Sequence, residues 1–136
     1  ARRGTMPWAV LRETTAAVLA RFDVRPANPD ARGRELSGGN QQKLVFGREL
    51  SDEPSAVVAE NPTRGLDIRA TTAVHAQLRA ARDAGCAVVV YSSDLDEVLA
   101  LADRVTVAYS GRLVGEFPRG EANPYDLGRL MTGVGA

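Results

Sequence analysis

The sequence has little of what several large classes of protein need. Its 136 residues include one cysteine, one histidine and one lysine, and 17 basic residues are balanced by 17 acidic ones. A formal net charge of zero provides no field that would attract a phosphate backbone along the whole molecule, so a general nucleic-acid binder is disfavoured. Any anion that the chain binds must therefore be held by local geometry.

The single lysine and the short apolar runs exclude two further features. Lys43 follows Gln42 and not a glycine, so the chain contains no P-loop of the form Gly-x-x-x-x-Gly-Lys-Ser/Thr. The longest apolar stretch, residues 86–91, is far below the ~20 residues of a membrane-spanning helix, and no apolar signal segment follows the N-terminus. Cys86 has no partner for an internal disulfide and is interpreted as a small buried hydrophobe in a cytoplasmic protein.

The hydrophobic pattern predicts an α/β fold in which helices and short strands alternate. Apolar residues three to four apart predict helices, and short apolar runs bounded by turn residues predict buried strands. The order strand, helix, strand over residues 56–92 predicts a parallel pair with a right-handed crossover. The expected helices are 8–22, 39–50, 70–83, 95–102 and 126–131; the expected strands are 56–59, 86–92, 105–109 and 113–117; a turn-rich loop covers 23–34, and Ser110-Gly111 is a hairpin turn.

Two adjacent glycines precede the second expected helix, in the segment Leu-Ser-Gly-Gly-Asn-Gln-Gln-Lys at residues 36–43. Glycines allow a ligand to approach the backbone, and the helix start offers unpaired N–H groups and the positive end of its dipole. Ser37 adds a hydroxyl donor, so this corner suits a phosphate. An ordinary glycine-containing helix start, capped by Ser37, explains the same residues, and the physics alone leaves both interpretations open.

A second candidate region runs from Ala56 to Asp67. Glu60 ends the expected strand there, and its carboxylate would lie at the carboxyl edge of the sheet, where ligands of open α/β sheets bind. From that position Glu60 could reach Mg²⁺ through a water molecule. Alternatively, Glu60 pairs with an arginine and Asp67 caps the helix that begins near Ile68.

Together the two regions resemble the ATP-binding cassette family of transport ATPases. Residues 36–41 look like its signature motif, usually Leu-Ser-Gly-Gly-Gln, with Asn40 in place of the last residue. The other matches are residues 56–61 (Walker B strand), 65–67 (D-loop), and 88–94 with 95–98 and 102–105 (a strand, the switch region and the helix behind it). Four motifs in the family's order cover nearly the whole chain, which makes the resemblance specific.

The resemblance implies a fold and a setting. Asn-Gln-Gln-Lys after the paired glycines, with Asn-Pro-Thr-Arg-Gly-Leu-Asp, is similar to the second cassette of tandem ATPase subunits of bacterial importers of simple sugars and nucleosides. Residues 1–50 would then be the end of the helical signature subdomain, and residues 51–136 the back half of a P-loop NTPase core with a parallel sheet. Expected partners are the first cassette or a second copy, transmembrane permease subunits and, indirectly, a substrate-binding protein, at the inner face of the cell membrane and without nucleic acid.

In this family two cassettes dimerise head to tail, and ATP is held between the P-loop of one and the signature motif of the other. The resemblance therefore implies that the chain contacts MgATP held by a partner cassette. The implied nucleotide-binding residues are Ser37, Gly38, Gly39, Asn40, Gln41 and Asp67, with Glu60 near Mg²⁺ through water.

Besides Asn40, three positions depart from the family pattern, and Glu60 is the first of them because an aspartate is usual there. Asn61 stands where a catalytic glutamate is usual, and an amide cannot accept a proton from water at neutral pH. Ser93 replaces the switch histidine, since His75 falls in the middle of an expected helix and is interpreted as a surface or packing residue. The resemblance thus implies no confident catalytic residue and a degenerate site on this cassette, and the chain alone, lacking a P-loop, is expected to be inactive.

Two other functions are compatible with the same motifs. The signature motif also occurs in chromosome-maintenance and repair ATPases, and a regulatory module without nucleotide contact is the third alternative. Whichever holds, a parallel sheet without its front strands is expected to expose an edge and apolar faces, so we predict self-association.

Overall fold

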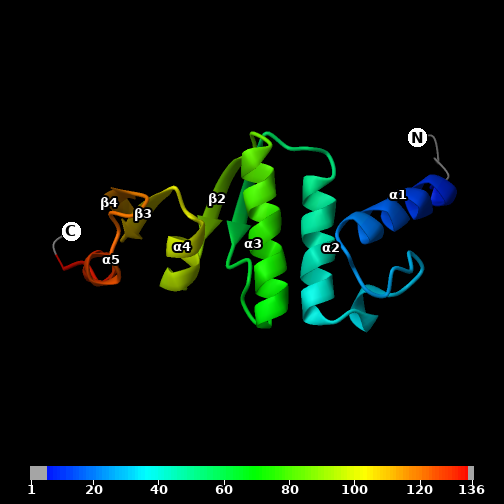
Figure 1. The fold of residues 1–136 in the computed structure, drawn as a ribbon, viewed down its shortest axis with the longest axis horizontal. Coiled ribbons are helices and arrows are strands. Elements are labelled where there is room, and N and C mark those ends of the chain that lie inside the picture. The colour runs from blue at the N-terminus through cyan, green and yellow to red at the C-terminus, as the bar shows by residue number, and fades with distance from the viewer. Residues whose placement is uncertain (1–5, 135–136) are drawn as a thin grey trace. The chain divides into compact units, whose positions relative to one another are not determined.

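The computed structural model describes residues 6–134 and confirms the α/β class (Figure 1). Each predicted helix and strand is present, with ends shifted by at most about two residues. In chain order the elements are α1 (Trp8–Arg21), η1 (Gly33–Glu35), α2 (Gly38–Leu50), β1 (Ala56–Glu60), α3 (Ile68–Asp83), β2 (Ala87–Tyr91), α4 (Leu95–Leu101), β3 (Arg104–Tyr109), β4 (Arg112–Pro118) and α5 (Pro124–Met131). No helix in this part of the chain is both long and apolar enough to cross a membrane.

Contacts divide the chain into two compact units, with the division passing through β1 and β2. The first unit runs up to Val57 and resumes over Pro62–Val89, and the second comprises Val58–Asn61 and the chain from Val90 onward. The expected division between a helical part ending at residue 50 and an ATPase core stays a prediction.

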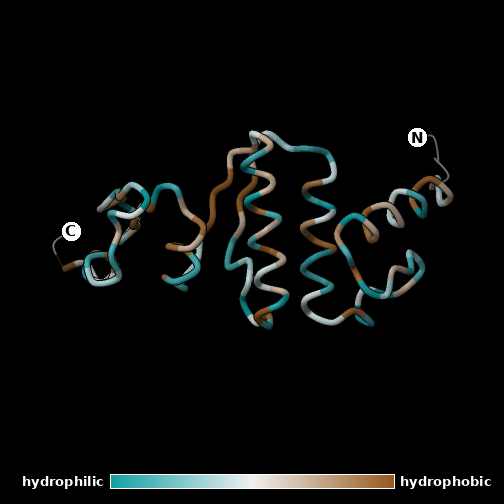
Figure 2. The backbone as a smooth tube through the Cα atoms, in the orientation of Figure 1, coloured by the Kyte–Doolittle hydropathy of each residue, from teal (hydrophilic) through white to brown (hydrophobic). Residues whose placement is uncertain are grey.

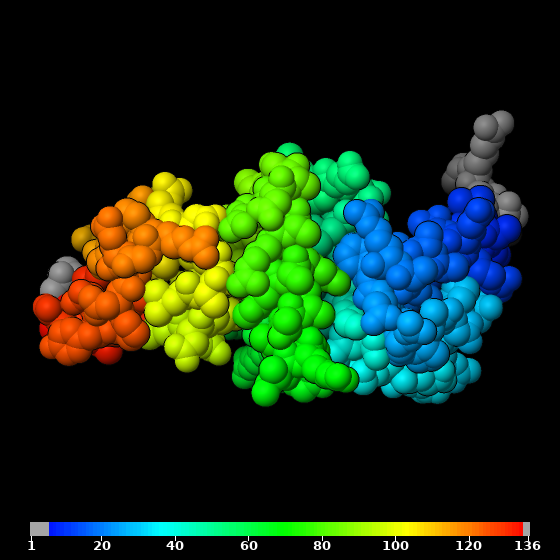
Figure 3. All heavy atoms as spheres, viewed as in Figure 1, coloured from blue at the N-terminus to red at the C-terminus, as the bar shows by residue number. Residues whose placement is uncertain are grey.

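The first unit is built from three helices that pack through small residues and regularly spaced apolar ones. In α3, Val74 and Leu78 are four residues apart and buried, as the period of a helix requires for one face. α2 and α3 lie side by side in Figure 1, and the outer side of α3 forms a continuous ridge in Figure 3 (green). A Cβ on Gly47 of α2 would lie 2.7 Å from Val18 Cγ1 of α1, so the absence of a side chain there allows α1 to pack closely.

β1 and β2 form a parallel pair, as predicted. The Ala87 N–H at the start of β2 donates to the Ser55 carbonyl just before β1 (2.9 Å), and the Asn61 N–H just after β1 donates to the Tyr91 carbonyl at the end of β2 (2.7 Å). Matching starts and matching ends mean that the two strands run in the same direction.

The prediction that these two strands are buried is wrong for alternate residues. Ala59 is buried, whereas Val58 is 75% exposed, Val89 57% and Tyr91 61%. Successive side chains of a strand point to opposite faces, so the exposed set shares the uncovered side of each strand. The strands are largely brown in Figure 2, which shows how much apolar surface their sequence carries.

The second unit contains the predicted hairpin and a small core. β3 pairs antiparallel with β4, with Val105 opposite Phe117, and the two turn residues Ser110 and Gly111 have positive φ values of 46° and 76°. Val105, Val107 and Leu127 form the buried centre. Partly buried residues pack against them from α4, α5 and the hairpin: Leu95, Val98, Leu99, Val114, Phe117 and Leu130.

Candidate functional site

The glycine corner is the start of α2, as predicted. Ser37 is the N-cap with extended backbone (φ −63°, ψ 157°), and its Oγ accepts a hydrogen bond from the Asn40 N–H at 3.4 Å. Gly38 is the first helical residue. The capping interpretation of Ser37 is thereby confirmed, and the side chain remains exposed, which is compatible with a ligand contact as well.

Asp67 begins the neighbouring helix in the same way. Its Oδ1 accepts a hydrogen bond from the Ala70 N–H at 2.8 Å and so caps α3. The capping alternative for Asp67 is confirmed. A carboxylate at a helix start is stabilised by the unpaired N–H groups and the helix dipole.

The two helix starts meet at one small pocket. A Cβ on Gly39 would lie only 2.9 Å from the Ala70 Cβ, so the missing side chain at Gly39 allows α2 and α3 to approach at their N-termini. The cavity beside them, which we name the two-helix pocket, has a volume of about 160 Å³ and also carries two cations, Lys43 and Arg69. Its full lining is Ser37, Gly39, Asn40, Lys43, Asp67, Arg69 and Ala70. The Lys43 Nζ also lies 3.5 Å from the Asp23 carboxylate outside the lining. The two helix N-termini and Arg69 face the single carboxylate of the lining, Asp67, so the pocket favours an anion.

Side-chain amides form hydrogen bonds between the start of α2 and the surrounding backbone. The Gln41 Nε2 donates to the carbonyls of Gly33 (3.2 Å) and Leu36 (3.0 Å), and the Gln42 Nε2 donates to the Pro62 carbonyl (2.9 Å). The resemblance implies that Gln41 binds nucleotide, whereas in this structure its amide nitrogen donates to these two carbonyls. Its role toward a ligand stays a prediction.

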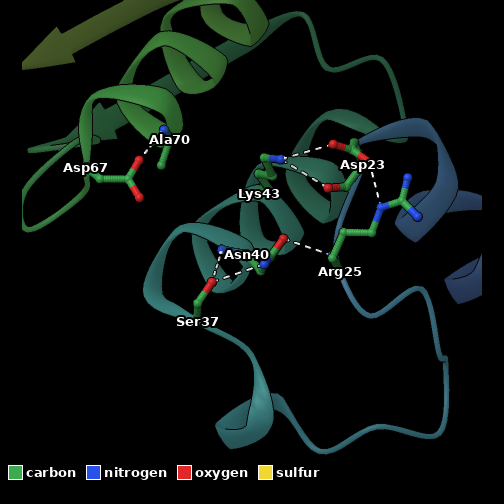
Figure 4. Close-up of polar contacts among 7 residues, drawn as sticks. All are labelled: Asp23, Arg25, Ser37, Asn40, Lys43, Asp67 and Ala70. Carbon is green, nitrogen blue, oxygen red and sulfur yellow. Dashed lines mark hydrogen bonds and ion pairs between the residues drawn. The ribbon is translucent and has the colours of Figure 1, made fainter.

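A second set of contacts joins α2 to the loop after α1 (Figure 4). The Asn40 Oδ1 accepts from the Arg25 N–H at 2.8 Å, and the Lys43 Nζ donates to the Asp23 carbonyl at 3.0 Å. The Arg25 Nε also donates to Asp23 Oδ1 at 2.9 Å. This hydrogen bond from Arg25, with the charges of Arg25 and Lys43, lowers the pKa of Asp23 below its ordinary value. These partners are not predictable from the sequence, because the turn-rich loop has no residue spacing that indicates which of its residues contacts α2.

The end of β1 brings together Asn61 and Ser93, which stand where catalytic residues are usual in the family. Asn61 has a positive φ of 43°, a conformation that asparagine tolerates better than most residues, and its Oδ1 accepts from the Ser93 N–H at 3.4 Å. Glu60 beside it is exposed. Within residues 6–134 no three potential ligands among His, Cys, Asp and Glu cluster for a metal ion, and the contact of Glu60 with Mg²⁺ through water stays a prediction.

His75 and Cys86 are both half-buried, with different outcomes for what the sequence predicts. His75 lies within α3 and is half-buried, in agreement with a surface or packing role. Cys86 is also half-buried, so its interpretation as a buried residue is wrong. It precedes β2 and borders an open cavity of about 550 Å³, which explains the exposure of its side chain.

Curated proteins similar to the chain are ATP-binding proteins of importers. The guanosine import ATP-binding protein NupO of Bacillus subtilis is 41% identical over 117 residues, which are 86% of this chain and 23% of that protein. The glucose import ATP-binding protein TsgD13 of Haloferax volcanii is 40% identical over 96% of this chain and 24% of its own length. The chain thus spans about a quarter of these relatives. No protein-family model matches it.

Solved structures agree on the fold. The cassette MJ0796, solved as a dimer in a post-hydrolysis state with ADP and phosphate, superposes with a TM-score of 0.69 over 85% of this chain and 50% of that one, at 24% identity. The chain is a segment of an ATP-binding cassette. The ADP form of the cassette MJ1267 also matches this cassette segment, with a TM-score of 0.69 and 22% identity, over 95% of the segment and 48% of that chain.

Proposed function

We propose that this cassette segment belongs to the ATP-binding subunit of an importer of simple sugars or nucleosides. Within it, the start of α2 would contact the terminal phosphoryl group of ATP held by a partner cassette. The observation that carries the proposal is the two-helix pocket, where Ser37 and Gly39 at the start of α2 border a cavity that also carries the cations Lys43 and Arg69.

The similarity to importer proteins supports the setting. NupO and a nucleoside import protein of Lactococcus lactis (40% identical over 85% of this chain) both act in nucleoside uptake by name, and the others named for their substrate act on ribose or glucose. A partner cassette would supply the P-loop that this chain lacks, and permease subunits at the inner face of the membrane would use the energy of hydrolysis. The importer names of these similar proteins support a role in transport over a role in chromosome maintenance.

The site at the end of β1 is proposed to be degenerate. Asn61 cannot serve as general base, and its amide oxygen is already bonded to the Ser93 N–H. Glu60 would hold Mg²⁺ only through water. We therefore assign this chain to the productive site of its partner, as the donor of the signature residues, and not to a hydrolytic site of its own.

The direct test is Ser37→Arg in the full-length subunit. An arginine side chain fills the pocket and removes the hydroxyl donor, so ATP hydrolysis is expected to fall by about 100-fold or more, the range found when a transition-state donor is removed. Ser55→Arg places the same side chain at an exposed serine outside the two-helix pocket and serves as the control. Near-normal hydrolysis by Ser37→Arg would contradict the proposal.

A second experiment tests the need for a partner. The isolated chain is titrated with MgATP by calorimetry, alone and then with an intact first cassette. Because the chain lacks a P-loop, we expect little binding alone and tighter nucleotide retention by the pair. Equal binding in both cases would show that nucleotide contact does not depend on a partner cassette.

A further inference from the structure

We infer that Asn40 is a positioning residue that orients the Ser37 hydroxyl toward the phosphoryl group. The inference rests on the proposed function and concerns how the signature serine is prepared for its ligand. It assigns to the side chain of Asn40 a role that acts through Ser37 and needs no contact with the nucleotide.

The hydrogen bonds at Ser37 Oγ determine where its proton lies. This oxygen accepts from the Asn40 Nδ2 at 3.0 Å and from the Asn40 N–H at 3.4 Å. A hydroxyl oxygen has two acceptor positions and one hydrogen. With both acceptor positions facing donors of Asn40, the O–H bond points away from them, and the hydroxyl is left as a donor. That is the role an anionic ligand requires.

Chemistry at the other end of Asn40 fixes the orientation of its amide. The Arg25 backbone N–H lies 2.8 Å from Oδ1 and can only donate, so the oxygen of the amide must face it. The nitrogen of the amide is then the atom that faces Ser37. One side chain thus bridges the loop after α1 to the cap of α2, as Figure 4 shows.

The length of the side chain matters for this arrangement. Asn40 is three residues after Ser37, and its short amide reaches the cap of its own helix. Lys43, one turn further along α2, donates to the Asp23 carbonyl and holds the same loop in place. The Arg25 N–H that orients Asn40 is therefore supported by a second contact from α2.

The test is a double-mutant cycle on ATP hydrolysis by the full-length subunit, with Ser37→Ala, Asn40→Ala and the double variant. If Asn40 acts through Ser37, Asn40→Ala lowers kcat about tenfold with Ser37 present, with little change in KM, and causes no further loss when residue 37 is alanine. Gln42→Ala is the matched control. It also removes a hydrogen bond made by a side-chain amide of α2, the one from Gln42 Nε2 to the Pro62 carbonyl, but Gln42 does not contact Ser37. Its effect is expected to be the same in both backgrounds.

Asn40→Asp provides a second variant of the same size. It keeps an acceptor for the Arg25 N–H but turns the donor at Ser37 into an acceptor, so the hydroxyl would donate to the carboxylate and not to the phosphoryl group. We expect kcat to fall at least as far as in Asn40→Ala, and to remain low at 0.5 M salt, where simple charge repulsion is screened.

Two results would overturn the inference. One is a double variant whose loss of kcat equals the product of the two single losses, and the other is recovery of kcat by Asn40→Asp at high salt. The proposed function has a separate outcome. If Ser37→Arg abolishes hydrolysis while the cycle shows no coupling, the signature role stands and only the role of Asn40 falls. If Ser37→Arg leaves hydrolysis intact, both fall.

Discussion

Single residues decide how the two helix starts meet. Gly38 and Gly39 are adjacent in sequence, yet a Cβ on Gly38 would meet nothing within 4 Å, whereas one on Gly39 would lie 2.9 Å from Ala70 Cβ. The two glycines therefore differ in what they allow: the missing side chain at Gly39 permits α2 and α3 to pack closely, whereas a side chain at Gly38 would meet open space.

This difference predicts opposite outcomes for two neighbouring substitutions. Gly39→Ala is expected to lower the free energy of unfolding of the chain by about 1–3 kcal/mol, because α2 and α3 must separate to admit the methyl group. Gly38→Ala should be neutral or stabilising by up to about 1 kcal/mol, because alanine favours the helix. Urea unfolding followed by circular dichroism measures both, and equal effects would contradict the assignment.

The lowered pKa of Asp23 predicts how the loop contact responds to acid. Because the folded-state pKa lies below the ordinary value near 4, the ionised carboxylate stabilises the folded chain above about pH 4. That stabilisation is lost as the pH falls through the lower, folded-state pKa. Asp23→Asn should therefore be less stable than the wild type at pH 7, with the difference disappearing once the pH is below the lowered pKa of Asp23.

The measurement is urea unfolding of both proteins at several pH values. Salt provides the control, because Asp23 and Arg25 are exposed and their attraction is screened in about 1 M salt. A difference that stays constant from pH 7 to pH 2 would show that the charge of Asp23 is not its source.

At the level of elements, the contact between α1 and α2 depends on one glycine. Gly47 is buried in α2, and a Cβ there would lie 2.7 Å from Val18 Cγ1 and 2.9 Å from the Phe22 ring. A helix loses stability from an internal glycine, so its presence is explained by the close approach of α1.

Gly47→Ala is accordingly expected to destabilise the chain by about 1–3 kcal/mol through overpacking. The matched control is Gly128→Ala in α5, where the added Cβ meets nothing within 4 Å and the gain in helix propensity is about 0.5–1 kcal/mol. Thermal and urea unfolding report both. Stabilisation by Gly47→Ala would mean that α1 does not pack on α2 in solution.

For the molecule as a whole, the open side of β1 and β2 is the feature with the largest expected consequence. Val58, Val89 and Tyr91 are more than half exposed, whereas the residues that alternate with them on the two strands are partly or fully buried. Large apolar side chains left in water favour association.

We therefore predict that the isolated chain self-associates at micromolar concentration. Val58→Lys with Val89→Lys should shift sedimentation toward the monomer, because a charge on an apolar contact surface costs desolvation energy. Leu113→Lys, at a residue that is 77% exposed on β4, is the control and should have little effect. A monomer with a cooperative thermal transition at every concentration would contradict the prediction.

Local patterns were sufficient for the secondary structure and the helix caps. The period of apolar residues predicts α1 and α3, the turn Ser110-Gly111 predicts the hairpin, and the residue types of Ser37 and Asp67 before a helix are typical of N-caps. Each depends on residues within about four positions of one another, where backbone geometry leaves few choices.

The sequence by itself determined the order of elements and the motif residues that identify a cassette segment. Tertiary structure alone decided that the starts of α2 and α3 share one pocket, that Asn40 contacts Arg25 fifteen residues away, and that one side of β1 and β2 is open. The reason is physical: helix period and capping arise from neighbouring residues, whereas burial and long-range hydrogen bonds depend on which surfaces the folded chain brings together.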